Sequence, residues 1–374
     1  MRLLNRLTRL LALGAVACTI QACSTVHFYE QAILGQLEIW RRTRPVEEVI
    51  ADPQTTPFIR ERLRLLTTAR DFAQAELALP DHGSYHSYAD LERSYVVWNV
   101  FAAPELSLQP VSSCFPIAGC LDYRGFFSPE AARQRAEKLK AEGYDVFSGG
   151  VVAYSTLGWL NDPILNTYLH WEKARLVETL FHELAHQRLY VEDDSRFNES
   201  FATAVARAGL RRWNEKHAEN AQLEVADKAR ENTLIALILE TREDLAELYA
   251  SSLPETEKLA DKQRYFAEMQ TRYAAVKAAW QDDKSFDSWM SGEWNNARIM
   301  AVATYNDFVP AFERLLRESD NDFELFFRVV TTLGALPPAE RTACLNALLE
   351  DENPAPCVAS LAPRKPQALT QVDE

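Results

Sequence analysis

The sequence predicts a predominantly helical α+β fold with a small sheet, a pair of adjacent helices near its middle and a helical C-terminal half. Apolar residues recur at helical spacing over most of the chain. An aromatic, β-branched and turn-rich stretch at residues 81–125 interrupts them and predicts strands and loops. The 374 residues are 47% hydrophobic and 25% charged. This composition excludes wholesale disorder and leaves enough length for a well-buried core.

Residues 1–22 are expected to be a secretory signal. Residues 1–9 carry three Arg and no acid, and the apolar run at residues 10–20 is too short to span a bilayer as a helix. The segment IQAC, which ends at Cys23, resembles a bacterial lipobox and predicts lipidation of this cysteine. Because Ser24 follows, we expect a periplasm-facing protein anchored in the outer membrane of the cell envelope. The alternatives are an ordinary cleaved signal peptide or a buried first helix.

The charge balance limits the possible partners. The formal net charge is −14, and it becomes −17 if residues 1–22 are removed with their three Arg. No run of Lys or Arg resembles a nucleic-acid-binding arm, so no nucleic acid is expected as a partner. An acidic body does not favour adsorption onto anionic lipid either, which is consistent with attachment through a covalent anchor.

The mature chain is expected to consist of three consecutive parts. These are an N-terminal helical and strand part at residues 23–110, a catalytic core at residues 111–220 and a helical C-terminal region with a loose tail at residues 221–374. Helical periodicity and end signals such as Pro and Gly predict the helices. Their ranges are 57–79, 129–142, 172–191, 197–217, 222–250, 256–281, 296–318, 322–333 and 338–350.

The segment DVFSGGVVAYSTLG, residues 145–158, is expected to be a strand. Its glycine pair, Gly149 and Gly150, would allow another backbone to approach closely. The alternative is an interior strand with a glycine bend.

Cysteine usage is consistent with export. Beyond Cys23 the chain has four cysteines: Cys114, Cys120, Cys344 and Cys357. An even number in an exported protein suggests two disulfides. Three pairings are possible, and we expect the two local ones because they close the shortest loops. Buried free thiols are the alternative.

The motif His-Glu-x-x-His at residues 182–186 carries the strongest chemical signal. On a helix, His182 and His186 lie one above the other and can bind one Zn²⁺ ion. Glu183 lies next to the first ligand, from where its carboxylate can reach a metal-bound water. A pair of ordinary histidines is the structural alternative, and so is a structural metal closed by four protein ligands.

A catalytic site needs a third ligand, and Glu199 in the segment FNESFA is the candidate. The intervening loop is long enough to reverse direction, and Asp194 or Ser195 can cap a second, antiparallel helix. Small residues share the face of Glu199 to within a helical turn and would let the two helices approach closely: Ala202, Ala206 and Gly209. The rival ligands are the loop acids at residues 192–194.

These residues predict metal-dependent hydrolysis of a peptide substrate. Zn²⁺ lowers the pKa of bound water and polarises a carbonyl group. Glu183 would accept the water proton and pass it to the leaving amine. The oxyanion needs a further donor, for which Tyr154, Tyr190 and Tyr305 are candidates.

The two metal motifs resemble the gluzincin group of zinc peptidases, in which the second helix carries a Glu-x-x-Ala element. Further segments are similar to a family of bacterial exported lipoproteins described as putative aminopeptidases. They are CFPIAGC at residues 114–120 with YRG at 123–125, GVVAYSTLGW at 150–159, FHELAHQ and FNESFA. The likeness extends over most of the mature chain and is strongest between residues 95 and 210. It implies a zincin-like core, zinc at His182, His186 and Glu199, and Glu183 as the catalytic acid/base.

One departure keeps alternatives open. Aminopeptidases of this group hold the free ammonium of the substrate with an acid in the strand beside the metal, and residues 150–159 contain none. Glu178 lies one turn before His182 but is more simply a solvated or supporting helix residue. An endopeptidase or an envelope-processing amidase is therefore the alternative within the same class. An alternative of another class is a non-catalytic envelope scaffold or binding lipoprotein that presents the acidic helices of residues 222–281. The sequence does not predict an oligomeric state.

Overall fold

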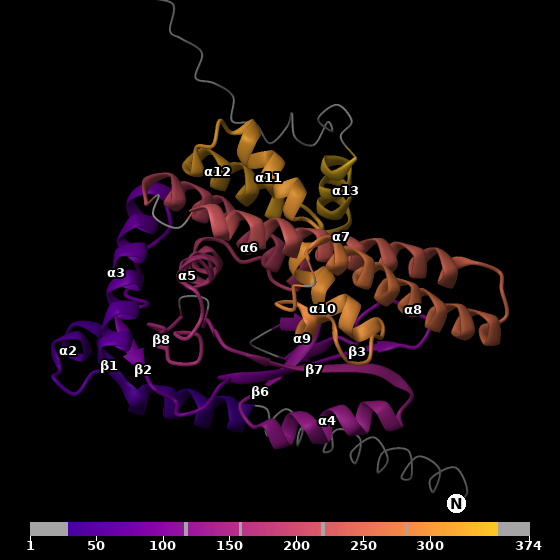
Figure 1. Cartoon of the computed structure of the whole chain (residues 1–374), viewed down its shortest axis with the longest axis horizontal. Helices are drawn as coiled ribbons and strands as arrows, with labels where there is room; N and C mark the ends of the chain where they lie inside the picture. The colour runs from indigo at the N-terminus through magenta and orange to yellow at the C-terminus, as the bar shows by residue number, and fades with distance from the viewer. Residues whose placement is uncertain (1–28, 116–118, 157–158, 218–220, 282, 351–374) are drawn as a thin grey trace, which may run out of the picture.

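The computed structural model describes residues 29–115, 119–156, 159–217, 221–281 and 283–350 (Figure 1). It begins with a helix at residues 29–42, followed by β1 (Thr43–Pro45), α2 (Val46–Ala51) and α3 (Pro57–Leu77). Thr56 caps α3 by accepting the Ile59 N–H, and Pro57 occupies its first turn, where a missing N–H costs nothing. The helix predicted at residues 57–79 is confirmed.

Three short sheets account for the strand content. The largest is antiparallel with strand order β6–β3–β7, and it contains β3 (Val97–Pro104), β6 (Tyr123–Phe126) and β7 (Tyr144–Val151). In the second, β2 (Ser87–Ala89) pairs with β1 and with β8 (Ile164–Leu165). The third is the hairpin of β4 (Ser113–Phe115) and β5 (Gly119–Leu121).

The strand predicted at residues 145–158 is shorter than expected. It forms an edge of its sheet but ends at Val151, and residues 157–158 lie outside the described part. The strand ends there because Val151 pairs with Val97, the first residue of β3, so the neighbouring strand offers no further partner. The expectation for Gly150 is also corrected. A Cβ atom there would lie 2.4 Å from the ring of Tyr95, so this glycine makes room for a side chain and not for another backbone.

The remaining elements are helices, in agreement with the predicted predominance of helix. Their bounds are α4 (Pro129–Ala141), α5 (Lys173–Arg188), α6 (Ser195–Lys216), α7 (Ala221–Ala250), α8 (Glu255–Ala279), α9 (Asp287–Met290), α10 (Asn296–Asn306), α11 (Val309–Glu318), α12 (Phe323–Gly334) and α13 (Pro338–Leu349). The single helix predicted at residues 296–318 is wrong. It divides into α10 and α11 because Pro310 cannot donate to the carbonyl of Asn306, and its ring would clash with that carbonyl in a continuous helix.

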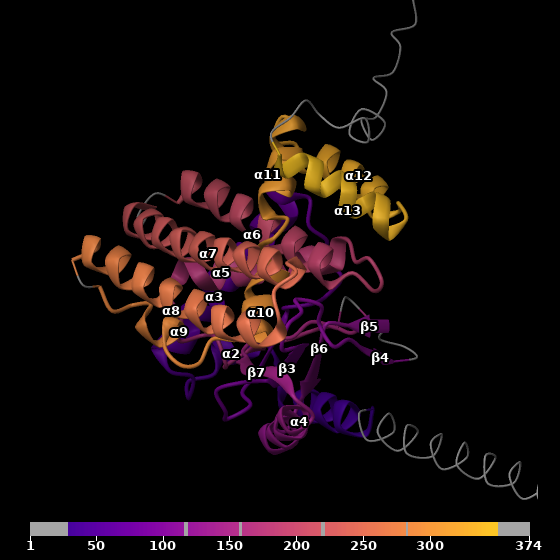
Figure 2. The ribbon, with the colours of Figure 1, turned by 90° about the vertical axis from the view of Figure 1, so that its right-hand side faces the viewer.

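The main buried core surrounds the helix pair α5 and α6. It joins α3 on one side to α11, α12 and α13 on the other, and large aromatic residues such as Phe181, Phe201 and Phe312 lie at its centre. A second cluster lies between α7, α8 and α10, and a third lies between the main sheet and α4. Figures 1 and 2 place α11–α13 at one end of the molecule and the helix of residues 29–42 at the other. The main core draws on all three predicted parts of the chain, whose boundaries stay a prediction.

Among the described residues, none of the helices has both the length and the apolar character needed to cross a bilayer.

Candidate metal centre

Helix α5 supplies both histidines of the predicted motif. Leu180, Phe181 and Leu184 are almost completely buried and fix the rotation of the helix against the core. His182 and His186 consequently share the neighbouring face, with ring centroids 4.8 Å apart. His186 is 7% exposed and His182 is only partly buried, so the pair lies at the boundary between core and surface.

Glu199 approaches the two rings from α6, which packs against α5. Its Oε2 atom lies 3.2 Å from Nε2 of His182 and 3.5 Å from Nε2 of His186. The two Nε2 atoms are 3.1 Å apart. The close packing that this requires depends on Gly209, because a Cβ atom there would lie 2.7 Å from Leu77 and 2.8 Å from Phe181.

The three atoms form a triangle that suits a tetrahedral metal ion. Nitrogen and oxygen ligands lie 2.0–2.1 Å from Zn²⁺, so two ligands of a tetrahedral site are about 3.3 Å apart. The observed sides of 3.1, 3.2 and 3.5 Å agree with this spacing. His182, His186 and Glu199 therefore form a group that could hold a metal ion and leave its fourth position open.

The charges of the site stabilise an ionised third ligand. Burial alone would raise the pKa of Glu199, but the charge and hydrogen bonds of His186 and His182 outweigh it and lower the pKa to about 2. Burial also raises the pKa of Glu183, and the two histidines only partly oppose this. A carboxylate with a raised pKa is suited both to accept a proton and to return it.

Tyr305 and Tyr190 lie close enough to the metal-binding residues to be affected by the charge of Glu199. The ring of Tyr305 stacks on His182 with a centroid distance of 6.1 Å. Burial raises the pKa of both tyrosines, and the charge of Glu199 raises it further. Both hydroxyls therefore stay protonated at neutral pH and can donate a hydrogen bond.

Tyr123 on β6 is a further candidate donor, to which the sequence analysis assigned no role. Burial and the charges of Glu199 and Glu183 raise its pKa well above the ordinary value. Its place in the YRG segment was the only available signal, because a strand residue distant in sequence reveals no contact with the helix pair. Tyr154 differs, since its ring packs on Phe127 at 5.5 Å and Asp162 is the charge that acts on it. Burial raises its pKa to about 12.

The two residues that flank Glu199 hold it in place. Asn198 is 1% exposed, accepts the Val191 N–H at 2.8 Å and donates to the Val191 carbonyl at 2.7 Å, which fixes the loop between α5 and α6. Ser200 accepts the Phe308 N–H at 3.2 Å and donates to the carbonyl of Thr304, next to Tyr305. The same short stretch of α6 thus positions both the carboxylate and the tyrosine.

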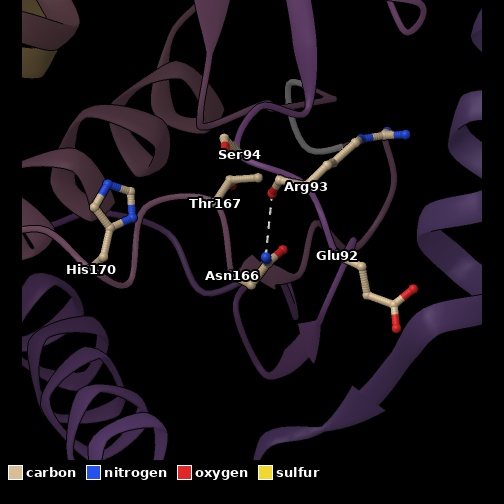
Figure 3. A pocket seen from close by; sticks show the side chains of 6 residues that line it. All are labelled: Glu92, Arg93, Ser94, Asn166, Thr167 and His170. Carbon is tan, nitrogen blue, oxygen red and sulfur yellow. Dashed lines mark hydrogen bonds between the residues drawn. The ribbon is translucent and has the colours of Figure 1, made fainter.

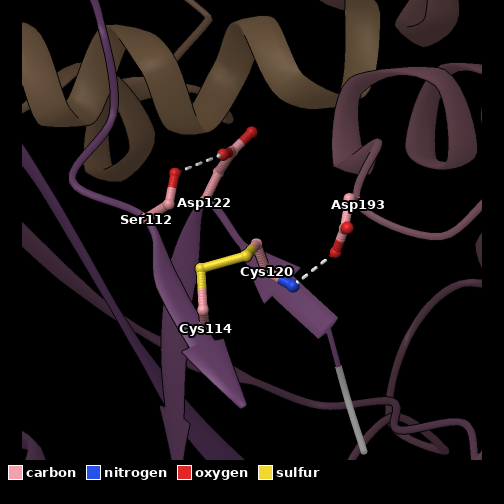
Figure 4. Close-up of a disulfide and its surroundings, with 5 residues drawn as sticks. All are labelled: Ser112, Cys114, Cys120, Asp122 and Asp193. Carbon is pink, nitrogen blue, oxygen red and sulfur yellow. Dashed lines mark hydrogen bonds between the residues drawn. A yellow bond between two sulfur atoms is a disulfide. The ribbon is translucent and has the colours of Figure 1, made fainter. Parts of the chain in front are cut away.

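The loop acids that were rival ligands have other partners. Asp194 caps α6, as expected, by accepting the Phe197 N–H, and it also binds Arg341 of α13. Asp193 accepts the Cys120 N–H at 2.6 Å, so the hairpin β4–β5 rests on this loop (Figure 4). Glu192 is exposed, and the metal-binding group found among the described residues contains no loop acid.

The structure contains the local disulfide between Cys114 and Cys120 (Figure 4). Cys344 on α13 is also disulfide-bonded, whereas its predicted partner Cys357 lies outside the described residues. Cys23, the predicted lipidation site, lies outside them as well.

Two acids near the site are already engaged. Glu178 forms an ion pair with Lys228 of α7 at 2.8 Å. Asp162 is 1% exposed and accepts hydrogen bonds from Ser155 and Thr156. Neither carboxylate is therefore open to bind the ammonium group of a substrate.

A shallow pocket of about 300 Å³ lies elsewhere, and its lining includes none of the three metal-binding residues (Figure 3). Arg93 in this lining binds Glu38 and two backbone carbonyls, and Asn166 accepts the Leu91 N–H. These polar groups are therefore used in hydrogen bonds and an ion pair within the protein.

An α+β fold with two histidines and a carboxylate on a packed helix pair defines a protein with a candidate catalytic metal centre. The chain belongs to the family described as "Putative aminopeptidase", whose model matches residues 27–345. Membership of this family indicates a peptidase. No curated protein and no solved structure matches the chain.

Proposed function

We propose that the chain is a zinc-dependent aminopeptidase with a zincin-like core. The observation that carries this proposal is the triangle of His182, His186 and Glu199 ligand atoms, with Glu183 beside it on the same helix. The triangle fits one tetrahedral ion, and the family membership supplies the reaction class.

The roles of the residues follow from their positions. A bound zinc ion would polarise the scissile carbonyl and make a water molecule more acidic. Glu183 accepts the proton of the attacking water and returns it to the leaving amine. Tyr305, whose ring stacks on His182, donates a hydrogen bond from its hydroxyl to the oxyanion, and Tyr190 and Tyr123 are the alternative donors.

Release of N-terminal residues is the part of the proposal that depends on the family alone. Asp162 and Glu178 already have other hydrogen-bond or ion-pair partners, so neither residue identifies where the free amine of a substrate would bind. A peptide-library digest read by mass spectrometry, with and without a chelator, separates the possibilities. Loss of single N-terminal residues supports an aminopeptidase, whereas internal cleavage indicates an endopeptidase and cleavage of envelope amides indicates an amidase.

Replacement of Glu183 by Gln tests the catalytic role. The variant keeps all three metal ligands but has no group to accept the proton of water, so turnover should fall at least about 100-fold while bound zinc is unchanged. Zinc content by elemental analysis and peptide turnover are the two measurements. Unchanged turnover would contradict the role of Glu183, whereas a wild type that binds zinc without any turnover would favour a scaffold over an enzyme.

The proposed location is the bacterial cell envelope, with a lipid on Cys23 and the body facing the periplasm, at the outer membrane. The lipobox-like segment before Cys23 supports it, and the local disulfide is consistent with an oxidising compartment. Labelling with a clickable fatty acid tests it, and a mature protein without label would overturn the anchor.

A further inference from the structure

The helix of residues 29–42 turns apolar side chains away from the body of the protein. Ile33 and Leu34 are 58% and 59% exposed, and Trp40 is 47% exposed. These are three of the eight large hydrophobic residues that are exposed in the described part of the chain, so apolar exposure is concentrated on this helix. Contiguous apolar exposure of this kind marks an interaction surface.

The opposite side of the helix is fixed against the protein. Gly35 is so close to Phe127 that a Cβ atom would lie 2.2 Å from the ring, and Ile39 is 1% exposed. Gln31 accepts the Phe127 N–H at 2.7 Å. These contacts set the rotation of the helix, so Ile33 and Trp40, seven residues apart on one face, cannot turn inward.

We propose that this outward face, formed by Ile33, Leu34 and Trp40, lies in the interface of a lipid bilayer. The inference rests on the proposed anchor, since only five residues separate Cys23 from Tyr29, the first described residue of the helix. Such a segment spans about 20 Å at most, so a lipid on Cys23 would hold the helix at the membrane surface. A Trp beside an exposed Arg, as in Trp40 and Arg41, is a pair that favours the interface.

The charge of the protein indicates how the contact forms. With a net charge of −17 after removal of residues 1–22, the processed protein is not drawn to anionic lipid, so insertion of apolar side chains must supply the attraction. The contact also orients the molecule. Figures 1 and 2 place this helix at the end opposite α11–α13, so these helices, and α6, which packs on α11, are held away from the bilayer.

Nitroxide labels on the processed full-length protein test the contact. Labels at Ile33→Cys and Trp40→Cys are compared with one at Leu253→Cys, which replaces a residue that is 40% exposed between α7 and α8. The protein is bound to vesicles of phosphatidylethanolamine and phosphatidylglycerol. We expect the two helix positions to become severalfold more accessible to oxygen and less accessible to a water-soluble nickel complex, with no change at position 253.

Three outcomes separate this inference from the anchor. Equal exposure to water at all three positions on bound protein would overturn it. Protection without vesicles, with a doubled mass by light scattering, would overturn it in favour of a second copy of the chain. If no fatty acid is incorporated, the anchor fails by itself. Membrane contact by this face is then supported only if the unlipidated protein still sediments with vesicles. The double variant Ile33→Gln, Leu34→Gln should no longer sediment with them, whereas the control Leu253→Gln should.

Discussion

Arg341 connects the C-terminal helix α13 to the first turn of α6. Its Nε and Nη2 atoms lie 2.8 and 2.7 Å from one carboxylate oxygen of Asp194, and the other oxygen of Asp194 accepts the Phe197 N–H. Arg341 is 4% exposed and also donates to the carbonyls of Gly334 and Leu336. The start of the helix that carries Glu199 therefore depends on a residue far along the chain.

Replacing Arg341 with Gln should weaken metal binding. The carboxylate of Asp194 loses its charged partner, the start of α6 loosens and Glu199 is held less firmly, so zinc affinity should fall by about 10-fold or more. Competition with a fluorescent chelator measures it. Arg314→Gln is the matched control, because Arg314 of α11 donates to the Leu348 carbonyl of the same α13. Equal zinc affinity in both variants would contradict a positioning role for Arg341.

Asp162 should make stability depend on pH. Burial raises its pKa from the ordinary 3.8 to about 6, and the charge of Glu183 contributes. The folded state therefore keeps a proton that the unfolded state releases between these values. This proton stabilises the folded state fully below about pH 4, and the stabilisation is lost as the pH rises through 6. The resulting decrease in the free energy of unfolding is about 3 kcal/mol.

Urea unfolding of the wild type and of Asp162→Asn at pH 4.5 and 7 measures this effect. The asparagine cannot ionise, so the difference in unfolding free energy between the two proteins should shift in favour of the variant as the pH rises. A difference that is constant across this interval would show that Asp162 is ionised throughout.

Among the elements, the hairpin β4–β5 depends on its disulfide and supports the loop between α5 and α6. Its Cys120 N–H donates to Asp193, and the short loop closed by Cys114 and Cys120 limits the disulfide stabilisation to about 2 kcal/mol. The double variant Cys114→Ser, Cys120→Ser should therefore fold, but amide exchange in residues 119–122 and 189–194 should become faster.

Hydrogen exchange read by mass spectrometry checks this expectation. Ser112→Ala is the control, since it removes the hydrogen bond from Ser112 to Asp122 beside the same hairpin without affecting Asp193. If exchange in residues 189–194 does not change in the double variant, the hairpin does not support the loop.

The sequence predicts those features that depend on local spacing. His182 and His186 share a face because four residues make about one helical turn. Asp194 caps α6 because the side chain of a cap residue reaches the N–H three residues later, here that of Phe197. The division between α10 and α11 also has a local cause, which is Pro310. The sequence predicts a single helix there because the helical periodicity continues on both sides of this proline. Long-range contacts are different. Beyond the place of Tyr123 in the YRG segment, nothing in the sequence joins Tyr123 or Arg341 to the site. Ser200 is next to Glu199 in the sequence, but its contacts with Thr304 and Phe308 are brought about only by the tertiary fold.

At the scale of the whole molecule, one buried ion pair connects the sheet to the helical C-terminal half. Lys262 of α8 is 2% exposed, and its Nζ lies 2.7 Å from Asp145 of β7 and 2.9 Å from the Glu105 carbonyl. The same carboxylate accepts the Asn296 N–H at the start of α10. Three elements from separate parts of the chain thus meet at one charge pair.

Lys262→Met should lower the free energy of unfolding by about 3 kcal/mol, because it leaves the carboxylate of Asp145, whose side chain is only 12% exposed, without its counter-charge. The double variant Asp145→Asn, Lys262→Met should recover part of this loss, since the unpaired negative charge is then gone as well.

Lys277→Met is the control on the same helix. Lys277 pairs with Asp287 at the surface, with side chains 21% and 39% exposed, and a pair of this kind contributes at most about 1 kcal/mol. Denaturant unfolding of the three variants measures these differences. Equal losses for Lys262→Met and Lys277→Met would show that the buried pair does not hold the sheet to the helices.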